Sequence, residues 1–201
     1  MSLSSRMVLV LTSVGLLSGG FLASVGVFTK ERIALNKQRE IEAAIVSVVP
    51  RTNSSQKIFE EKGLTVYEGT DEGGELAGFA VYASGTGFQD EITLMYGTDA
   101  SITKISSLTI LNQLETPGLG AKITDKDSFL QFWENKDSSP PLTLHKPAVK
   151  SPEDLSSTEI NTITGATISS EAVLNIVNLS LERLLDLKKE GKLTIEGDDA
   201  K

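Results

Sequence analysis

The sequence predicts an α+β protein: a single domain with a central, mostly antiparallel sheet flanked by helices, preceded by one membrane-spanning helix. Three observations lead to this expectation. An uncharged apolar stretch lies near the start, short alternating segments separated by glycine turns fill the middle, and a strongly amphipathic helix lies near the end. Strands in the middle with helices at both ends are typical of the α+β class.

The composition of the 201-residue chain excludes several kinds of site. There is no cysteine, so disulfides, thiolate metal sites and cysteine nucleophiles are excluded. The single histidine, His145, rules out a cage of several histidines around a metal. The net charge of −8 argues against a nucleic-acid surface.

The segment 7–28 has the length and composition of a membrane anchor. It carries no charged side chain and would span about 33 Å as a helix, enough to cross a bilayer core of roughly 30 Å. A cleaved signal peptide is the alternative, but the apolar run exceeds the usual core of roughly 7–15 residues and no Ala-x-Ala site closes it. We therefore expect an uncleaved anchor after a short tail at residues 1–6.

The charges beside the anchor bear on its orientation. Arg6 precedes it, whereas four basic residues follow it closely: Lys30, Arg32, Lys37 and Arg39. By the positive-inside rule, this count alone favours a cytoplasmic location for the C-terminal domain.

A helical stalk at residues 29–50 follows the anchor, with apolar side chains near helical spacing and Pro50 to end it. The domain is expected at 51–195, and the polar tail 196–201 should fray. Period-two alternation and glycine turns predict strands at Leu64–Tyr67, Glu75–Ala83, Ile92–Tyr96, Ile102–Leu111 and Leu142–Lys146.

Two helices are expected within the domain. The segment from Ser128 to Trp133 should be short, with Trp133 in the core. The helix from Ser169 to Lys189 should be the longer one, and Gly191 can stop it. Its buried stripe comprises Val173, Val177, Leu181, Leu184 and Leu185.

The entrance to that longer helix is the first candidate site. Residues 164–170 read Thr-Gly-Ala-Thr-Ile-Ser-Ser, so small and hydroxylated residues crowd a helix N-terminus. Free N–H groups and the positive end of the helix dipole favour an anion there, phosphate in particular. Gly165 and Ala166 would let a ligand approach the backbone, and Thr164, Thr167 and Ser169 could donate to its oxygens. The plain alternative is a Ser/Thr cap after a glycine turn.

The second candidate is the segment 115–122, which reads Glu-Thr-Pro-Gly-Leu-Gly-Ala-Lys and follows a predicted strand. Pro117 favours a turn, and Gly118 and Gly120 allow unusual backbone angles. Taken alone, this segment is also compatible with a simple turn in which Glu115 and Lys122 are solvated charges.

These two motifs, in this order and spacing, resemble the FMN-binding-domain family. Its members include the G subunit of Rnf ferredoxin:NAD⁺ oxidoreductase complexes and the C subunit of Na⁺-translocating NADH:quinone reductase. The similarity covers most of the chain, including the single anchor. The family's Ser/Thr-Gly-Ala-Thr-x-Ser/Thr signature corresponds to Thr164–Ser169. Members usually carry Asp three residues before this signature, where the chain has Asn161.

The resemblance implies that FMN is joined covalently to Thr167 through a phosphoester, attached by a flavin transferase that uses FAD. It further implies that Leu119 packs on the flavin ring and that the backbone of Gly118 and Gly120 approaches it. Glu115 and Thr116 would bond near the ring or hold the loop. Lys122 would stabilise an anionic reduced flavin. His145 is expected to be an ordinary strand residue.

The function implied is a membrane-anchored flavoprotein subunit that relays electrons within an Rnf-type complex, with partner subunits supplying the NAD⁺ site. The family topology would place the flavin domain on the outer, periplasmic side of the bacterial inner membrane, against the charge count. There are two alternatives. One is the C subunit of the quinone reductase, and the other is an anchored module that binds FMN or another anion without redox function.

Overall fold

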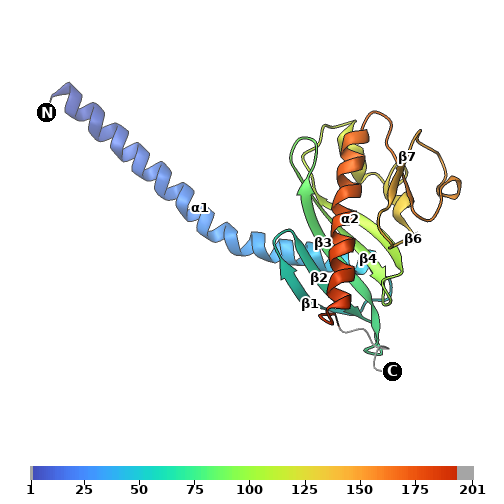
Figure 1. Cartoon of the computed structure of the whole chain (residues 1–201). Helices are drawn as coiled ribbons and strands as arrows, with labels where there is room; N and C mark the ends of the chain where they lie inside the picture. The colour runs from blue at the N-terminus through green and yellow to red at the C-terminus, as the bar shows by residue number, and fades with distance from the viewer. Residues whose placement is uncertain (1, 194–201) are drawn as a thin grey trace. The chain divides into compact units, whose positions relative to one another are not determined.

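The structure is a computed structural model that describes residues 2–193. The tail expected at 196–201 lies outside the described residues. The chain divides into two compact units, one ending at Ile41 and the other beginning at Glu42. Figure 1 follows the chain through its helices and strands.

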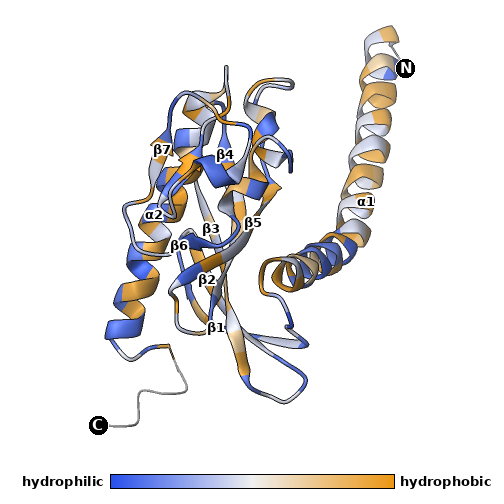
Figure 2. Cartoon of the chain, turned by 90° about the vertical axis from the view of Figure 1, so that its right-hand side faces the viewer, coloured by the Kyte–Doolittle hydropathy of each residue, from blue (hydrophilic) through white to orange (hydrophobic). Residues whose placement is uncertain are grey.

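The first long helix, α1, runs from Leu3 to Val48 without interruption. It is the one helix within residues 2–193 that is long and apolar enough to span a membrane. Figure 2 shows its first part largely in apolar colours and its later turns as more hydrophilic. The hydroxyls of Ser13, Ser24 and Thr29 donate to carbonyls four residues earlier in the same helix. Each hydroxyl proton therefore has a hydrogen-bond acceptor within the helix, which a lipid environment requires.

The end of α1 belongs to the folded domain. Ala44, Ile45 and Val48 are buried, as is Val49 just beyond the helix. The unit boundary at Glu42 therefore assigns residues 42–50, the end of the expected stalk, to the domain.

The central sheet is antiparallel throughout, as the sequence predicts. Its strands lie in sequence order: β1 (Ser54–Glu61), β2 (Leu64–Thr70), β3 (Leu76–Thr86), β4 (Glu91–Asp99), β5 (Lys104–Asn112) and β6 (Lys136–Asp137). Strand β1 was not predicted, because its polar, exposed edge position leaves no hydrophobic alternation.

A second, two-stranded sheet pairs β7 (Thr143–His145) with β8 (Glu159–Asn161) in parallel. Strand β8 was also missed by the sequence, since three residues carry no periodicity. It leads directly into the turn before the last helix. The expected short helix is a 3-10 turn at Leu130–Trp133, and Trp133 is fully buried as predicted.

The last helix, α2, runs from Thr167 to Lys189 and begins two residues earlier than expected. Figure 1 shows it lying across the sheet. The predicted stripe is confirmed: Val173, Val177, Leu181 and Leu184 are fully buried and join the main hydrophobic core, and Leu185 packs against it.

The two faces of the sheet are covered by different helices. A Cβ on Gly85 would lie 2.6 Å from Ile176 of α2, whereas one on Gly97 would lie 1.9 Å from the carbonyl oxygen of Val48. Gly97 of β4 lies directly opposite Ala80 of β3, so these two residues share a face of the sheet. Gly85 is five residues beyond Ala80 in β3 and therefore belongs to the other face, because successive residues of a strand alternate between faces. The contacts with Ile176 and Val48 are thus on opposite faces. The sheet thus carries α2 on the face opposite the one that Val48 contacts.

Candidate functional site

The start of α2 has no side-chain cap. Its N-cap residue is Ala166, and no side chain accepts a hydrogen bond at that position. The alternative that this segment is a Ser/Thr cap is therefore wrong. A helix that begins this way leaves its first N–H groups available to an external acceptor.

The available donors can be named. Within the described residues, no acceptor is recorded for the backbone N–H groups of Thr167, Ile168 and Ser169. The turn before them is fixed from behind. The hydroxyl of Ser170 donates to the carbonyl of Ala166 at 3.0 Å and accepts from the N–H of Ile163 at 3.2 Å. The helix start is therefore held in place while its open end stays free.

The residues before the helix leave room for a ligand. Thr164 is exposed, Thr167 is half-buried, and Gly165 adopts a φ of +83°. A Cβ added to Gly165 would meet only the Leu119 side chain, at 3.5 Å. This contact brings the two sequence motifs together, although the residues lie far apart in the chain.

The second motif forms a compact turn. The N–H groups of Leu119 and Ala121 both donate to the carbonyl of Thr116 at 3.1 Å. Gly118 has a φ of +77°, and a Cβ there would meet nothing within 4 Å. Leu119 and Lys122 are exposed. The turn therefore presents an apolar and a basic side chain at the surface.

Glu115, at the base of this turn, is buried, with only 4% of its surface exposed. One carboxylate oxygen accepts from the N–H groups of Phe88 and Gln89, at 2.7 and 3.1 Å. The other accepts from the Ser169 hydroxyl at 2.7 Å. The interpretation of Glu115 as a solvated charge is therefore wrong, because the structure encloses it among three donors.

The Ser169 hydroxyl has a different partner from the one the sequence suggests. It was expected to donate to phosphate, whereas the structure has it buried and donating to Glu115. A hydroxyl has one proton to donate, so this bond excludes simultaneous donation to a ligand. Thr164 and Thr167 retain hydroxyls without a recorded partner in the described part of the chain.

The loop at Phe88 and Gln89 was missed by sequence reasoning. Its signal is Gly87, since a Cβ there would lie 2.5 Å from Glu115 Oε1. That constraint becomes visible only once the fold places the loop beside Glu115.

Four exposed apolar side chains lie on the segments that form this network, and we call them the apolar rim. They are Phe88, Leu114, Leu119 and Ile168, each at least half exposed. The backbone of Phe88 donates to Glu115, and Leu119 belongs to the turn that begins at Glu115. Leu114 and Ile168 are next in sequence to Glu115 and Ser169. Apolar side chains beside open N–H groups match a ligand that carries both a flat apolar ring and an anionic group.

Asn161, at the position where an aspartate was expected from the resemblance, has a structural role. Its amide oxygen accepts from the N–H of Val149 and its amide nitrogen donates to the carbonyl of Val149, both at 2.9 Å. A carboxylate could accept the first bond but could not donate the second. The amide therefore suits this position better than an acid would.

His145 lies in β7, and its Nδ1 is 3.2 Å from Glu159 Oε1 in the neighbouring strand. The backbone N–H of Ser156 and this histidine lower the pKa of Glu159 to about 2. Within residues 2–193, no group of three or more acidic or histidine side chains is placed to hold a metal ion.

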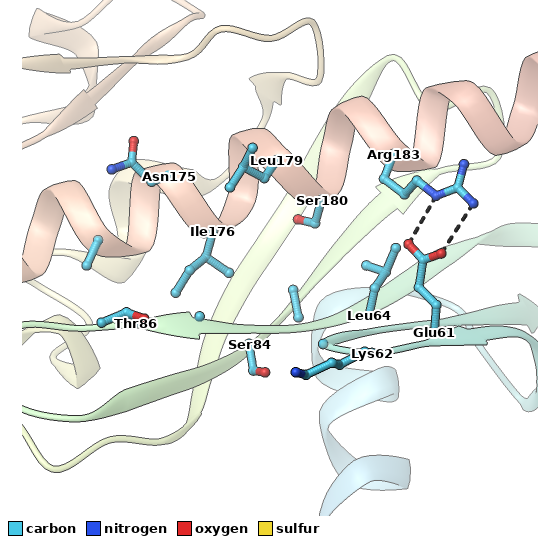
Figure 3. Close-up of a pocket in the computed structure, with 14 residues that line it drawn as sticks. Glu61, Lys62, Leu64, Ser84, Thr86, Asn175, Ile176, Leu179, Ser180 and Arg183 are labelled. Atoms are coloured by element: carbon cyan, nitrogen blue, oxygen red, sulfur yellow. Dashed lines mark hydrogen bonds and ion pairs between the residues drawn. The ribbon is translucent and has the colours of Figure 1, made fainter.

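A separate cleft of about 420 Å³ lies between α2, the β1–β2 turn and the end of β3 (Figure 3). At one end, Arg183 donates to both carboxylate oxygens of Glu61, at 3.0 and 3.2 Å. Leu179 lines the cleft and is largely exposed. None of the site residues expected from the sequence lines it, so the cleft is distinct from the helix-entrance site.

Comparison with known proteins identifies the domain. The FMN-binding domain family matches residues 87–182, which include both motifs, the Phe88 loop and most of α2. The G subunit of the proton-translocating ferredoxin:NAD⁺ oxidoreductase complex of Clostridium ljungdahlii is 30% identical over 87% of this chain and 88% of its own. The chain belongs to the G-subunit family of ion-translocating oxidoreductase complexes. The resemblance drawn from its motifs is confirmed.

Other relatives of this G-subunit protein agree. The G subunit of the ion-translocating oxidoreductase complex of Methanosarcina acetivorans is 23% identical over 89% of this chain and 93% of its own. Among solved structures, NqrC of Shewanella oneidensis shares 19% identity and superposes with a TM-score of 0.51 over 68% of this chain and 70% of its own. The C subunit of the Na⁺-translocating NADH-quinone reductase of Parabacteroides distasonis gives a TM-score of 0.50 at 21% identity, over 61% of each chain. These two show a shared fold.

Proposed function

We propose that this G-subunit protein relays electrons through FMN esterified to Thr167, within a membrane complex that couples ferredoxin and NAD⁺ chemistry to ion translocation. The observation that carries the proposal is the uncapped start of α2, where Thr167 is the first helical residue. The FMN-binding domain and the names of the relatives support the cofactor and the kind of complex.

The chemistry of the helix entrance suits a phosphoester. The ester phosphate keeps one negative charge, which the open N–H groups and the positive end of the helix dipole stabilise. Because Thr167 is the first residue of α2, a phosphate on its oxygen would be held by those groups. The covalent bond also prevents loss of the carrier into a dilute compartment.

The turn at residues 115–122 would hold the ring. Leu119 offers an apolar contact, and Gly118 leaves open space above the backbone. Lys122 carries a positive charge at the surface, which would favour an anionic reduced flavin. When bound, FMN supplies the electron-transfer chemistry, while these residues position the ring and adjust its charge environment.

Attachment requires a donor and a second protein. The Thr167 hydroxyl oxygen forms a bond to the FMN phosphorus of FAD, and the diphosphate P–O bond breaks. The leaving group, AMP, keeps the bridging oxygen and its electron pair, and the Thr167 proton goes to a base or to water. No oxidation or reduction occurs, so the step needs no redox partner, only a flavin transferase with FAD and a divalent metal ion.

Replacement of the acceptor tests this proposal. Thr167→Ala, co-produced with a flavin transferase, should lose all flavin fluorescence on a denaturing gel, because no oxygen remains to esterify. Ser180→Ala, which removes a hydroxyl bonded within α2, is the control and should keep its fluorescent band. A wild-type chain that shows no band under the same conditions would disprove covalent attachment. Co-purifying subunits would distinguish an Rnf-type complex from a quinone reductase.

We also propose that the FMN domain lies on the outer side of the membrane. The mixed charges of the stalk weaken the basic count that favours the cytoplasm, and partner subunits can orient a single anchor. Because the chain has no cysteine, Glu72→Cys in the exposed turn after β2 gives a unique label site. A membrane-impermeant maleimide should label it in intact cells. Labelling only after lysis would place the domain inside.

A further inference from the structure

We propose that Glu115 is a positioning residue that holds the first turn of α2, and with it the Thr167 hydroxyl, in the orientation needed for flavin attachment. This inference rests on the proposed function, since it concerns the same acceptor. It assigns a specific task to a buried carboxylate that does not itself need to touch the flavin.

The contacts of Glu115 join three segments. Its carboxylate receives two N–H donors from the loop after β3 and one hydroxyl donor from α2. The bond to Ser169 spans 54 residues of sequence. Its own N–H donates to the side chain of Gln113 at 2.6 Å. Hydrogen bonds therefore hold both the backbone and the carboxylate of Glu115. Through Ser169, the carboxylate holds the start of α2.

The choice of a carboxylate follows from its surroundings. All three groups facing its oxygens are donors, and an ionised carboxyl group is an acceptor only. Within residues 2–193, no lysine or arginine forms a salt bridge with it. Burial of a charge without a counter-ion is costly unless it is hydrogen-bonded, so the three bonds are required for the group to remain there.

The Glu115–Ser169 bond affects the position of Thr167 through the helix backbone. Ser169 and Thr167 lie in the same first turn of α2, so a shift of one moves the other. A side-chain cap would normally fix this turn, but Ala166 provides none. The hydrogen bond from Ser169 to Glu115 fixes the turn instead of a cap, and it leaves the backbone N–H groups of the turn without an acceptor. Gly120 allows this close packing, because a Cβ there would lie 2.5 Å from Ser169 Oγ and 2.6 Å from Glu115 Oε2.

The consequence concerns the attachment step described above, in which Thr167 Oγ must approach the FMN phosphorus of FAD as AMP leaves. Displacement of a reacting atom by about 1 Å can slow a reaction by roughly 100-fold. Loss of the Glu115–Ser169 bond should therefore slow flavin transfer by about tenfold or more. Stability alone would not account for a loss of this size at a temperature where the chain remains folded.

The test uses the full chain with FAD, a divalent metal ion and purified flavin transferase, and it measures the initial rate of covalent flavin incorporation together with the unfolding midpoint. Ser169→Ala should slow incorporation about tenfold. Glu115→Gln should have a smaller effect, because its amide oxygen still accepts from the loop and its NH2 group can donate to the Ser169 oxygen in a bond of reversed direction. Since the bond between these two side chains can be lost only once, the double variant should be no slower than Ser169→Ala alone.

The matched control is Ser180→Ala. Ser180 is also buried in α2, but its hydroxyl donates to the carbonyl of Val177 in the same helix. This variant should incorporate flavin at the wild-type rate. If Ser169→Ala does not fold, Glu115→Ala, which removes the acceptor of this bond, carries the test.

Two results would overturn the proposal. One is a wild-type rate in folded Ser169→Ala or, failing its folding, in Glu115→Ala. The other is single effects that multiply in the double variant. A wild-type chain that takes up no flavin at all would instead refute the acceptor, and is thus distinguishable.

Discussion

The two ends of α2 are built in opposite ways. At the C-terminal end the backbone is closed: Gly191 adopts a φ of +66°, its N–H donates to Lys188, and the N–H of Lys192 donates to Leu187. At the N-terminal end no side chain caps the helix, and the first N–H groups are open. Both ends belong to one stable helix, so the open end is not a consequence of weak folding.

The difference shows how a helix terminus can be held without being closed. The C-terminal end is satisfied by local backbone bonds, in the manner of a Schellman motif. The N-terminal end is held by long-range contacts from Glu115 and by the local hydroxyl of Ser170. These contacts leave the positive end of the dipole available, which is where an anionic cofactor is stabilised.

The largest effect is expected from Gly120→Ala, which would disrupt the hydrogen bond between Ser169 and Glu115. The added Cβ would meet Ser169 Oγ at 2.5 Å and Glu115 Oε2 at 2.6 Å, so the two bonded side chains must move apart. We expect a loss of about 1–3 kcal/mol in the free energy of unfolding, from overpacking. Flavin incorporation should fall as well. Urea unfolding of the full chain and the incorporation assay measure the two effects.

Gly191→Ala is its counterpart at the closed end. Space is not the difficulty there, because the Cβ would meet nothing within 4 Å. The positive φ should cost about 1 kcal/mol of unfolding free energy. Flavin incorporation should be unchanged. If both glycine variants reduced incorporation equally, the contrast between the two helix ends would be lost.

The smallest effect is expected away from both ends, at Glu159. The pKa of this carboxyl is lowered to about 2 by the Ser156 N–H and by His145. A lowered pKa means that the charge stabilises the fold above pH 4.5 and that this contribution is lost as pH falls towards 2. Glu159→Gln should therefore be slightly less stable than wild type at neutral pH.

The measurement is the unfolding midpoint between pH 7 and pH 2, and the difference from wild type should shrink across the acid range. The exposed Glu153→Gln is the control and should follow the wild-type curve. A difference that grew on acidification would contradict the assignment.

The features predictable from the sequence were those that depend on local pattern. The stripe from Val173 to Leu184 determines α2, and the alternation around Ile92–Tyr96 determines a strand in the core. The motif residues 164–169 could be found because their small size and hydroxyls are concentrated at a helix entrance. An exposed edge such as β1 carries no such pattern, since only the adjacent residues Ile58 and Phe59 on it are partly buried.

The role of Glu115 could not be read from the sequence. Next to Pro117 and two glycines it resembles a surface charge in a turn. Its burial depends on Phe88 and Ser169, which only the folded sheet brings to it. The same holds for Ser169, whose hydroxyl looked available for a ligand and is instead paired with Glu115. Local sequence indicates which groups could act, while long-range packing decides which of them remain free.

Mass analysis of the peptide that contains residue 167 is the most direct test of the account. Trypsin cleavage after Lys150 and Arg183 should release a segment that spans the whole helix entrance. In protein isolated from its native membrane, this peptide should carry the mass of FMN less one water, and fragmentation should place the addition on Thr167. The same peptide found unmodified, or modified at Thr164 instead, would contradict the assignment of the acceptor.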